Sequence, residues 1–154
     1  MTVNLPAPQI VDATLLHELR RRILRNNDPA VSVSDPRDDE AQAIHLAIVS
    51  DGLVVVCGSL YPSTSPHDES VASYQLRYMA ADDVVRGAGG GRALLERAGE
   101  IVLSRGVFHL WANARDTALG FYLATGWTTI PGSEHLSRET QLPHTVVVKN
   151  LRTA

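Results

Sequence analysis

The sequence predicts an α/β (α+β) fold with a mixed, mostly antiparallel central sheet of about six to seven strands, flanked by helices. Two β-rich runs, 43–49 and 53–60, are joined by Ser-Asp-Gly at 50–52, and Asp-Gly between such runs is a strong hairpin signal. Further along the chain, strand-like runs alternate with helical ones, as in a sheet with helices on its faces. At 154 residues, 44% of them hydrophobic, the chain is expected to form one domain, 1–154.

The N-terminal part predicts a short strand at 8–11 and then an amphipathic helix to about Arg25, with Asp12 or Thr14 as its N-cap. The apolar side chains of this helix recur at helical spacing: Leu15, Leu16, Leu19, Ile23 and Leu24. Its basic side chains are expected to form a solvated face: Arg20, Arg21, Arg22 and Arg25. Residues 26–40 are rich in Asp, Pro and Ser, and they predict a long loop or a loose second helix.

The C-terminal part alternates strands and helices. Regular alternation predicts a strand at 74–80, which leads to a glycine-rich segment at 86–91. Apolar residues then recur at helical spacing until Gly106, which is expected to end that helix. The remaining predicted elements are a strand at 107–111, a helix at 116–125 ended by Gly126, and strands at 127–130 and 145–148.

Composition excludes several classes of function. A net charge of -3 and a pI near 6.0 argue against nucleic acid as a partner, because proteins that bind nucleic acid gather basic side chains on one face. The single cysteine, Cys57, cannot form an internal disulfide, so a cytoplasmic location is the expectation. The N-terminal segment lacks a basic and then continuously apolar stretch, and no run of about eighteen apolar residues occurs. Neither secretion nor a membrane partner is expected.

The glycine-rich segment predicts an anion site. Four glycines in five positions open a helix, where backbone N–H groups lack internal partners and the helix dipole adds positive charge. A P-loop needs a lysine directly after its glycines, and the only lysine in the chain is Lys149. The dinucleotide fingerprint G-x-G-x-x-G fails as well, because Arg92 or Leu94 stands at its last position.

The pattern that fits is [QR]-x-x-G-x-[GA], filled by Arg86, Gly89 and Gly91 between a strand and an amphipathic helix. YMAADDVVRGAGGGRALLERA (78–98) resembles the acetyl-CoA pyrophosphate motif of the GNAT superfamily of N-acetyltransferases. About twenty residues on, LWANARDTALGFYLATGW (110–127) resembles that family's sequence of strand, Asn, helix, Phe-Tyr and then Gly with an aromatic residue. The resemblance covers about residues 74–130.

The resemblance implies direct transfer of an acetyl group from acetyl-CoA, the co-substrate, to a primary amine. The backbone of the strand before the glycines would bond the pantetheine arm, and the amides of the glycine turn would hold the pyrophosphate. The cofactor-binding residues carried over from the family pattern are Met79, Ala80, Ala81, Arg86, Gly87, Ala88, Gly89, Gly90, Gly91, Arg92, Asn113 and Tyr122. Asn113 would bond the pantetheine or position the next helix, and a helix or turn cap is the alternative.

Tyr122 matches the family tyrosine that protonates the departing CoA thiolate, so it is the candidate catalytic residue. The alternative is that Tyr122 and Phe121 only pack their helix on the sheet, and Trp127 is expected in the core. The general base stays open among the following residues and a bound water: His45, Glu69, His109, His135 and His144. Cys57, within an apolar run, is expected to be an inert thiol.

The sequence departs from the family pattern before and within the glycine turn. Residues 82–85 (Asp-Asp-Val-Val) replace a Pro-Glu or similar pair, and Gly90 replaces a large aliphatic residue, which is expected to loosen the turn. No metal is expected, because the histidines lack H-x-x-H or H-x-x-x-H spacing and one cysteine makes no Cys-rich site.

The acceptor is expected to be an amine of a small molecule or a peptide. Acidic residues near the predicted acceptor loops either attract a cationic amine or only solvate those loops: Asp35, Asp38, Asp39, Glu40, Asp68 and Glu69. The alternative function is a non-catalytic acyl-CoA-binding or regulatory module. If the chain assembles, a homodimer is the commonest form for such proteins.

Overall fold

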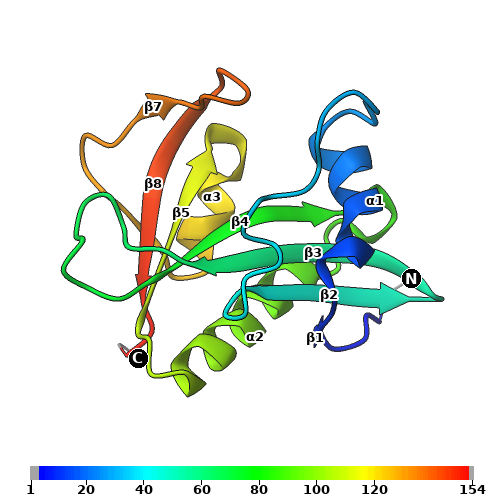
Figure 1. Cartoon of the computed structure of the whole chain (residues 1–154), viewed down its shortest axis with the longest axis horizontal. Coiled ribbons are helices and arrows are strands. Elements are labelled where there is room, and N and C mark those ends of the chain that lie inside the picture. The colour runs from blue at the N-terminus through cyan, green and yellow to red at the C-terminus, as the bar shows by residue number, and fades with distance from the viewer. Residues whose placement is uncertain (1–3, 153–154) are drawn as a thin grey trace. The chain divides into compact units, whose positions relative to one another are not determined.

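The computed structural model describes residues 4–152, and Figure 1 shows its helices and strands. The chain divides into two compact units. Unit 1 holds the described residues up to Tyr61 together with Arg77–Ile101, and unit 2 holds Pro62–Leu76 together with the described residues from Val102 onward. Each unit combines two separate stretches of sequence, and the single domain expected from chain length stays a prediction.

Unit 1 contains the N-terminal elements and the whole glycine-rich segment, 86–91. Its elements are β1 (Gln9–Ile10), the 3-10 turn η1 (Ala13–Leu16), α1 (His17–Leu19), the π-helical turn η2 (Arg20–Leu24), β2 (Ile44–Ser50), β3 (Leu53–Pro62), β4 (Tyr74–Ala81), the 3-10 turn η3 (Asp83–Val85) and α2 (Gly90–Ser104). β4 begins in unit 2 and α2 ends there. The expected loop at 26–40 is confirmed, since this stretch contains turns and no helix.

The predicted hairpin is confirmed. β2 pairs antiparallel with β3, and the turn between them places Asp51 at φ 51° and Gly52 at φ 78°. Two central residues with positive φ give the turn whose twist matches that of the flanking strands. β1 adds to the outer side of β2, with Gln9 opposite Ala47.

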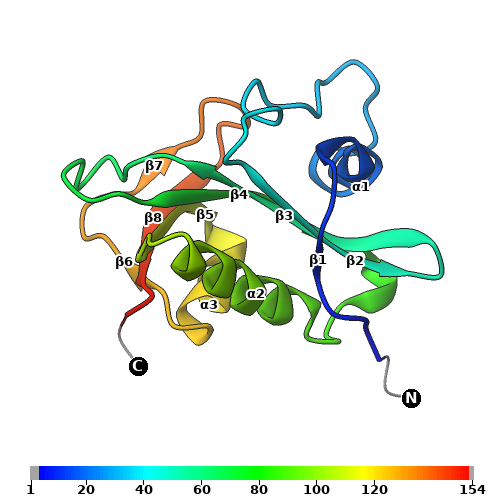
Figure 2. The same ribbon diagram turned by 60° about the horizontal axis from the view of Figure 1, so that its bottom comes forward.

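The expected N-terminal helix is present as a continuous run of 3-10, α and π turns from Ala13 to Leu24. Asp12 caps it, because its carboxylate accepts a hydrogen bond from the backbone N–H of Thr14 at 2.9 Å. Leu16 and Leu19 are fully buried and belong to a core cluster with residues of β2, β3 and β4. Figure 2 shows α1 and α2 on opposite faces of the β2–β3 hairpin.

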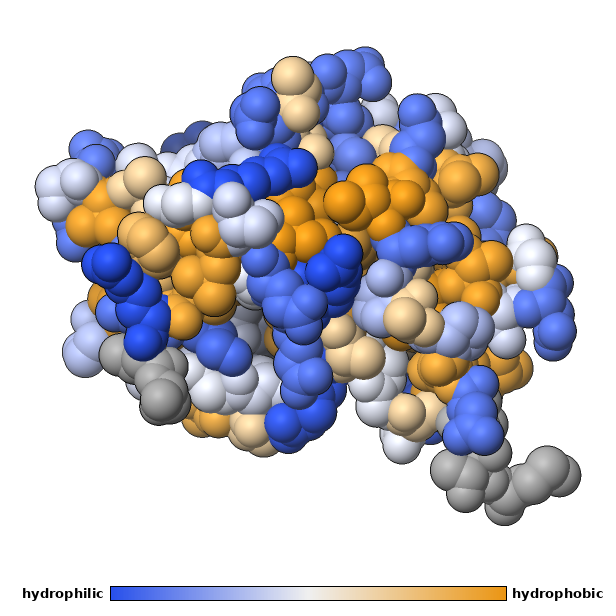
Figure 3. Space-filling view, turned by 90° about the horizontal axis from the view of Figure 1, so that it is seen from below, coloured by the Kyte–Doolittle hydropathy of each residue, from blue (hydrophilic) through white to orange (hydrophobic). Residues whose placement is uncertain are grey.

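Helix α2 buries one face against the sheet of unit 1. Leu94, Leu95 and Ala98 are buried, as their helical spacing predicted. The outward positions are charged and exposed: Arg92, Glu96, Arg97 and Glu100. Figure 3 views the side on which α2 lies and shows hydrophilic side chains gathered there among hydrophobic ones. Gly106, at φ 76°, follows the helix, as expected.

Unit 2 contains β5 (His109–Arg115), α3 (Asp116–Ala124), β6 (Thr128–Thr129), β7 (His135–Leu136) and β8 (Pro143–Asn150). β5 is longer than expected, because buried Ala112 and Ala114 continue its alternation around exposed Asn113. α3 ends before Gly126, at φ 94°, as predicted. The amine of Lys149 donates to the carbonyl of Thr125 at 2.9 Å, which satisfies an acceptor left over at the end of α3.

Hydrogen bonds link the strands in the order β1-β2-β3-β4-β5-β8-β6, and β7 pairs with β8. β4 and β5 are parallel, whereas the pairs β1–β2, β2–β3, β5–β8, β6–β8 and β7–β8 are antiparallel. The predicted mixed, mostly antiparallel sheet with flanking helices is confirmed. The sheet has eight strands, one more than expected. Strand β7 has only two residues, too few to leave a pattern in the sequence. Over residues 4–152, every helix falls short of the length and apolar character needed to cross a membrane.

Candidate functional site

The glycine-rich segment starts from a well-fixed turn. The carboxylate of Asp82 accepts a hydrogen bond from the backbone N–H of Val84 at 3.0 Å and so caps η3. The N–H of Asp82 donates to the carbonyl of Val55 on β3 at 2.8 Å, and Val85 is buried. The departure from the family pattern at 82–85 therefore keeps its own cap and its own anchor to the sheet.

Two glycines of the segment are needed for their backbone conformation. Gly87 has φ +79° and Gly89 has φ +84°, and a Cβ atom added to either would meet no atom within 4 Å. Side chains of L-residues rarely tolerate such φ values, whereas glycine adopts them readily. The space next to both positions is open, so the backbone there is accessible to a bound group.

Gly90 is needed because of its neighbours. A Cβ atom there would lie 2.7 Å from Cγ2 of Val56 and 3.5 Å from Cδ1 of Ile48. A larger residue at this position would therefore force its neighbours to move, and the expectation that this glycine loosens the turn stays a prediction. Without a side chain, the first residue of α2 fits closely against β2 and β3.

The start of α2 presents backbone donors. The amides of Gly90 and Gly91 belong to the first helical turn, where helix geometry provides no internal acceptor. The helix dipole adds partial positive charge at the same place. Arg92 is exposed in this turn, and the exposed Nε of Arg86 donates to Asp83 at 2.8 Å. The segment thus has the donors and the charge of an anion site.

The strand before the turn contains an unusual backbone conformation. Tyr78 has φ +59°, in the left-handed region, in the middle of β4. Such a conformation costs a non-glycine residue roughly 1–3 kcal/mol and persists only where the surroundings enforce it. Met79, Ala80 and Ala81 follow directly, and all three lie in unit 1 with the glycine turn. No sequence signal marked Tyr78, because tyrosine has no preference for positive φ.

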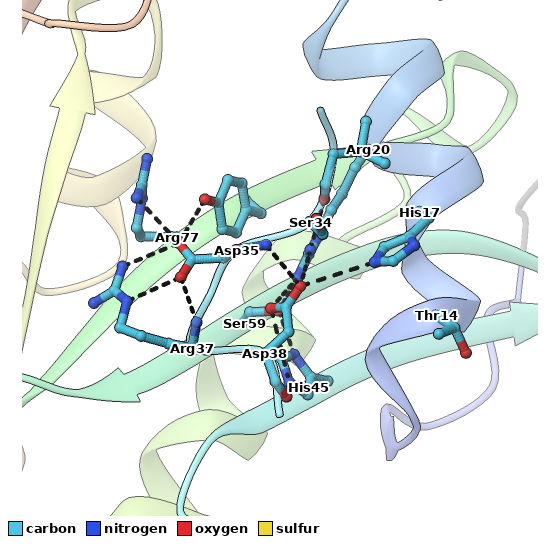
Figure 4. Close-up of polar contacts among 12 residues, drawn as sticks. Thr14, His17, Arg20, Ser34, Asp35, Arg37, Asp38, His45, Ser59 and Arg77 are labelled. Atoms are coloured by element: carbon cyan, nitrogen blue, oxygen red, sulfur yellow. Dashed lines mark hydrogen bonds and ion pairs between the residues drawn. The ribbon is translucent and has the colours of Figure 1, made fainter. Parts of the chain in front are cut away.

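Unit 1 also holds a buried network of charged side chains, shown in Figure 4. Arg20 is 1% exposed. Its Nη1 donates to Asp38 Oδ2 at 2.9 Å and to the carbonyl of Val33 at 2.9 Å, and its Nη2 donates to Ser59 Oγ at 2.7 Å. Tyr61 donates its hydroxyl to Oδ1 of Asp38. The expectation of a solvated face is therefore wrong for Arg20, because this side chain turns into the unit and ties the loop to β3.

A second carboxylate of the loop is equally engaged. Asp35 accepts hydrogen bonds from the Nε of Arg37 at 3.1 Å, the Nη1 of Arg77 at 3.3 Å and the hydroxyl of Tyr78 at 2.7 Å. The guanidinium of Arg77 lies 4.6 Å from the ring centre of Tyr78, and that of Arg20 lies 4.4 Å from it. These contacts hold the strained Tyr78 in place.

The pKa values of both carboxyl groups reflect these contacts. Burial alone would raise the pKa of Asp35, but hydrogen bonds from Arg37 and Tyr78 outweigh it and lower the pKa to about 2. Burial likewise opposes ionisation of Asp38, and the hydrogen bonds from Arg20 and Tyr61 keep its pKa well below the usual range. Both groups are ionised and hydrogen-bonded within the protein, so they do not form the acidic, solvated loop considered from sequence.

Among the candidate bases, His45 is buried and uses both ring nitrogens. Its Nε2 lies 2.9 Å from the carbonyl of Asp38, and its Nδ1 lies 2.7 Å from Oγ of Ser59. A carbonyl only accepts, so Nε2 carries a proton and, in the neutral ring, Nδ1 accepts from Ser59. His45 belongs to the network. Glu69 lies exposed in the loop before β4, and His109 begins β5.

The remaining predicted residues lie in unit 2. Asn113 is an exposed position of β5, opposite Val146 of β8. Tyr122 is the buried residue of α3, 7% exposed, and its ring meets that of Trp127 edge-on at 5.1 Å. Burial raises the pKa of Tyr122 to about 12. Trp127 is 2% exposed, as expected for a core residue. The turn and the strand residues therefore share one unit, while Asn113 and Tyr122 belong to the other.

Cys57 on β3 is fully buried, and its thiol donates to the carbonyl of Tyr78 at 3.5 Å. Burial raises the pKa of this thiol to about 12. A thiol in that environment stays protonated near neutral pH, so it is a poor nucleophile. The expected burial of this thiol is confirmed, and its inertness stays a prediction.

Comparison with known proteins identifies relatives of one kind. The chain is 29% identical over 142 residues to the uncharacterized N-acetyltransferase YitI of Bacillus subtilis strain 168, which covers 90% of this chain and 91% of the relative. No protein-family model matches the chain.

Solved structures share the fold along almost the whole chain. An acyl-CoA N-acyltransferase from Pseudomonas aeruginosa superimposes with a TM-score of 0.73 at 18% identity, covering 95% of this chain and 99% of its own. An aminoglycoside 6'-N-acetyltransferase complexed with coenzyme A superimposes with a TM-score of 0.72 at 13% identity, covering 97% and 99%. These similarities show that the chain has the fold of GNAT acetyltransferases, the fold that the two ordered motifs and the glycine turn had led us to expect.

Proposed function

We propose that this protein transfers an acetyl group from acetyl-CoA to a primary amine of a small molecule or peptide. The observation that carries the proposal is the glycine turn at the start of α2. Two of its glycines have positive φ beside open space, and a third lies directly on the sheet. A turn built in this way exposes amides to an anionic group that approaches the backbone closely.

The residues of unit 1 fit the phosphate-containing part of CoA. The amides of Gly87, Gly89, Gly90 and Gly91 would hold the pyrophosphate, whereas the amide of Ala88 already donates to the carbonyl of Val85 at 3.1 Å. The exposed Arg92 would add charge-assisted hydrogen bonds. The backbone of Met79, Ala80 and Ala81 would bond the pantetheine arm as an added strand does. Asn113 is proposed to contact the same arm or to position α3.

Bound acetyl-CoA supplies a thioester whose carbonyl carbon is open to attack by an amine. In the transfer, the amine nitrogen forms a C–N bond to that carbon while the C–S bond breaks, and the sulfur leaves with the electron pair as thiolate. We assign Tyr122 as the acid that protonates this thiolate. A pKa of about 12 keeps its hydroxyl protonated across the neutral range, as an acid requires. A base or a water takes the proton that the amine loses.

Contacts of three candidate residues support a narrower proposal for the base and the acceptor. His45 is proposed as structural rather than catalytic, because both ring nitrogens have partners. Asp35 and Asp38 are proposed not to attract the acceptor, because arginine and tyrosine side chains already satisfy them. A cytoplasmic location and a homodimer stay predictions.

The deciding measurement is calorimetric titration of the full chain with acetyl-CoA. Gly89→Glu places a side chain and a negative charge in the turn, so affinity is expected to fall by at least about 100-fold. Gly106→Glu is the matched control, because Gly106 also has positive φ and open space but lies outside the turn. Equal affinity in both variants, or no binding by the folded wild type, would rule the proposal out.

Catalysis is tested separately from binding. Release of CoA thiol is followed in a screen of primary amines, and Tyr122→Phe is expected to lower kcat by about 100-fold or more while affinity for acetyl-CoA stays unchanged. If the wild type binds acetyl-CoA and turns over no amine, the chain is an acyl-CoA-binding module instead. If Tyr122→Phe keeps full kcat, Tyr122 only packs α3 against Trp127.

A further inference from the structure

Two histidines face each other across the short strand pair of unit 2. β7 pairs antiparallel with β8, and His135 stands directly opposite His144. Side chains of directly opposite residues project to the same face of a sheet. The two imidazole rings accordingly lie 6.0 Å apart, centre to centre, with their planes tilted by 32°.

Both rings are held in the same way. The Nδ1 of His135 lies 2.8 Å from the carbonyl oxygen of Ser133, and the Nδ1 of His144 lies 2.8 Å from that of Leu142. A carbonyl oxygen only accepts, so each Nδ1 carries a proton, and the neutral ring leaves its lone pair on Nε2. Within the described part of the chain, the hydrogen bonds of both rings use Nδ1.

This arrangement is the one that metal-binding histidines need. Such a histidine donates one ring N–H to a carbonyl or carboxylate, which fixes the tautomer and directs the other nitrogen to the metal. Imidazole nitrogens lie about 2 Å from a zinc ion, so two nitrogens on one ion are separated by about 4 Å or less. Rings 6.0 Å apart can meet that spacing, since each nitrogen lies roughly 1 Å from its ring centre.

We propose that His135 and His144 bind one divalent cation of the kind that imidazole prefers, Zn²⁺, Ni²⁺ or Cu²⁺, through their Nε2 atoms. Among residues 4–152, no group of three or more His, Cys, Asp and Glu side chains could hold a metal ion. The site therefore has two protein ligands, and water completes the coordination. The bound ion connects β7 to β8 and so stabilises the 135–144 hairpin, independently of acetyl transfer.

One neighbouring charge opposes the cation. Arg115 of β5 stands opposite His144 on the other side of β8, so its guanidinium shares the face of the sheet. Repulsion between like charges lowers metal affinity. Arg115→Ala is therefore expected to raise the affinity severalfold, which no adventitious binding elsewhere on the chain would show.

The test is calorimetric titration of the untagged full chain with ZnCl₂ and, separately, NiCl₂. One ion per chain is expected to bind, and His135→Gln or His144→Gln is expected to lower the affinity at least about tenfold. The matched control is His67→Gln, an exposed histidine in the loop before β4, which is expected to leave binding unchanged. Added Zn²⁺ should raise Tm for the wild type and not for His135→Gln.

The proposal fails if no saturable binding occurs up to about 1 mM metal. It fails equally if His135→Gln binds as the wild type does, or if His67→Gln loses as much affinity. His144 is mostly buried, so His144→Gln is read only if it folds. His135 is exposed in a two-residue strand, so His135→Gln keeps the test decisive in either case.

Discussion

Unit 1 contains two polar regions that differ in whether their polar groups have hydrogen-bond partners within the protein. The glycine turn, residues 86–91, has few side chains, and the amides that open α2 lack partners within the helix. The network around Arg20, Asp35 and Asp38 is dense with charge, and its side chains are hydrogen-bonded to one another. A region that keeps donors available can bind a ligand, whereas a region that uses its donors internally stabilises the fold.

Tyr78 connects the network to the strand that leads to the glycine turn. The network holds the Tyr78 hydroxyl through Asp35 and its ring between two guanidiniums, while Met79 continues the strand toward the turn. The network thus supports the backbone that leads to the proposed CoA site. Its carboxylates are hydrogen-bonded within the network, so they offer no free charge to a ligand. Changes in the network should therefore act on stability, and a negative charge placed in the turn should act on binding.

The largest effect is expected from Arg20→Met. Removing the guanidinium leaves the buried carboxylate of Asp38 without its main partner, which typically costs about 3–5 kcal/mol in the free energy of unfolding. Arg97→Met is the control, because Arg97 pairs at the surface with Glu100 and should cost about 1 kcal/mol or less. Urea unfolding of the three proteins measures both values.

The affinity of Arg20→Met for acetyl-CoA tests whether the network also takes part in binding. At a temperature where Arg20→Met is folded, its affinity is expected to equal that of the wild type. A variant that is folded and stable but has lost affinity would show that the network takes part in binding, and the contrast between the two regions would then be wrong.

Sequence reasoning found the turn and missed the network for a physical reason. Glycines, a helix start and an adjacent strand are local features, so the spacing of Arg86, Gly89 and Gly91 sufficed to predict an anion site. The network joins residues that are distant along the chain, with Arg20 bonded to Asp38 and Ser59. A basic residue in a helix and an acidic residue in a loop each suggest a solvated surface until the fold brings them together.

The histidine pair of unit 2 shows the same limit. Histidine spacing within a helix argued against a metal site, but β7 and β8 bring His135 opposite His144 across the six residues 137–142. The sheet, its hairpin and its helices were predictable from periodicity, whereas β7 was too short to be seen. The pairing of two side chains across such a strand follows from register alone.

An intermediate effect is expected from acid. The pKa values of Asp35 and Asp38 are lower in the folded protein than the ordinary value of 3.8, so the unfolded chain binds protons first as pH falls. The stabilisation is complete above about pH 5 and is lost as pH falls toward 2. Urea midpoints measured between pH 6 and pH 2.5 should decline most steeply below pH 4.

Asp35→Asn serves as the control for this decline. The variant lacks one of the two low pKa values, so its stability should depend less on pH below 4, although it starts from a lower value. If the wild type and Asp35→Asn lose stability in parallel, other carboxyl groups cause the acid response, and the charges of the network are less important than their geometry suggests.

The smallest effect is expected from alanine substitutions in the glycine turn. The physical cause of the lost stability should differ between Gly90 and Gly87. Gly90→Ala forces a methyl group to within 2.7 Å of Val56, and overpacking of that sort typically costs about 1–3 kcal/mol of stability. Gly87→Ala meets no atom, so its cost comes only from the positive φ, about 1–2 kcal/mol. Urea unfolding should show a smaller cost of Gly90→Ala in a Val56→Ala background than in the wild type, whereas the cost of Gly87→Ala should be the same in both backgrounds. An equal cost of Gly90→Ala in the two backgrounds would mean that contact with Val56 of β3 is not what makes Gly90 necessary.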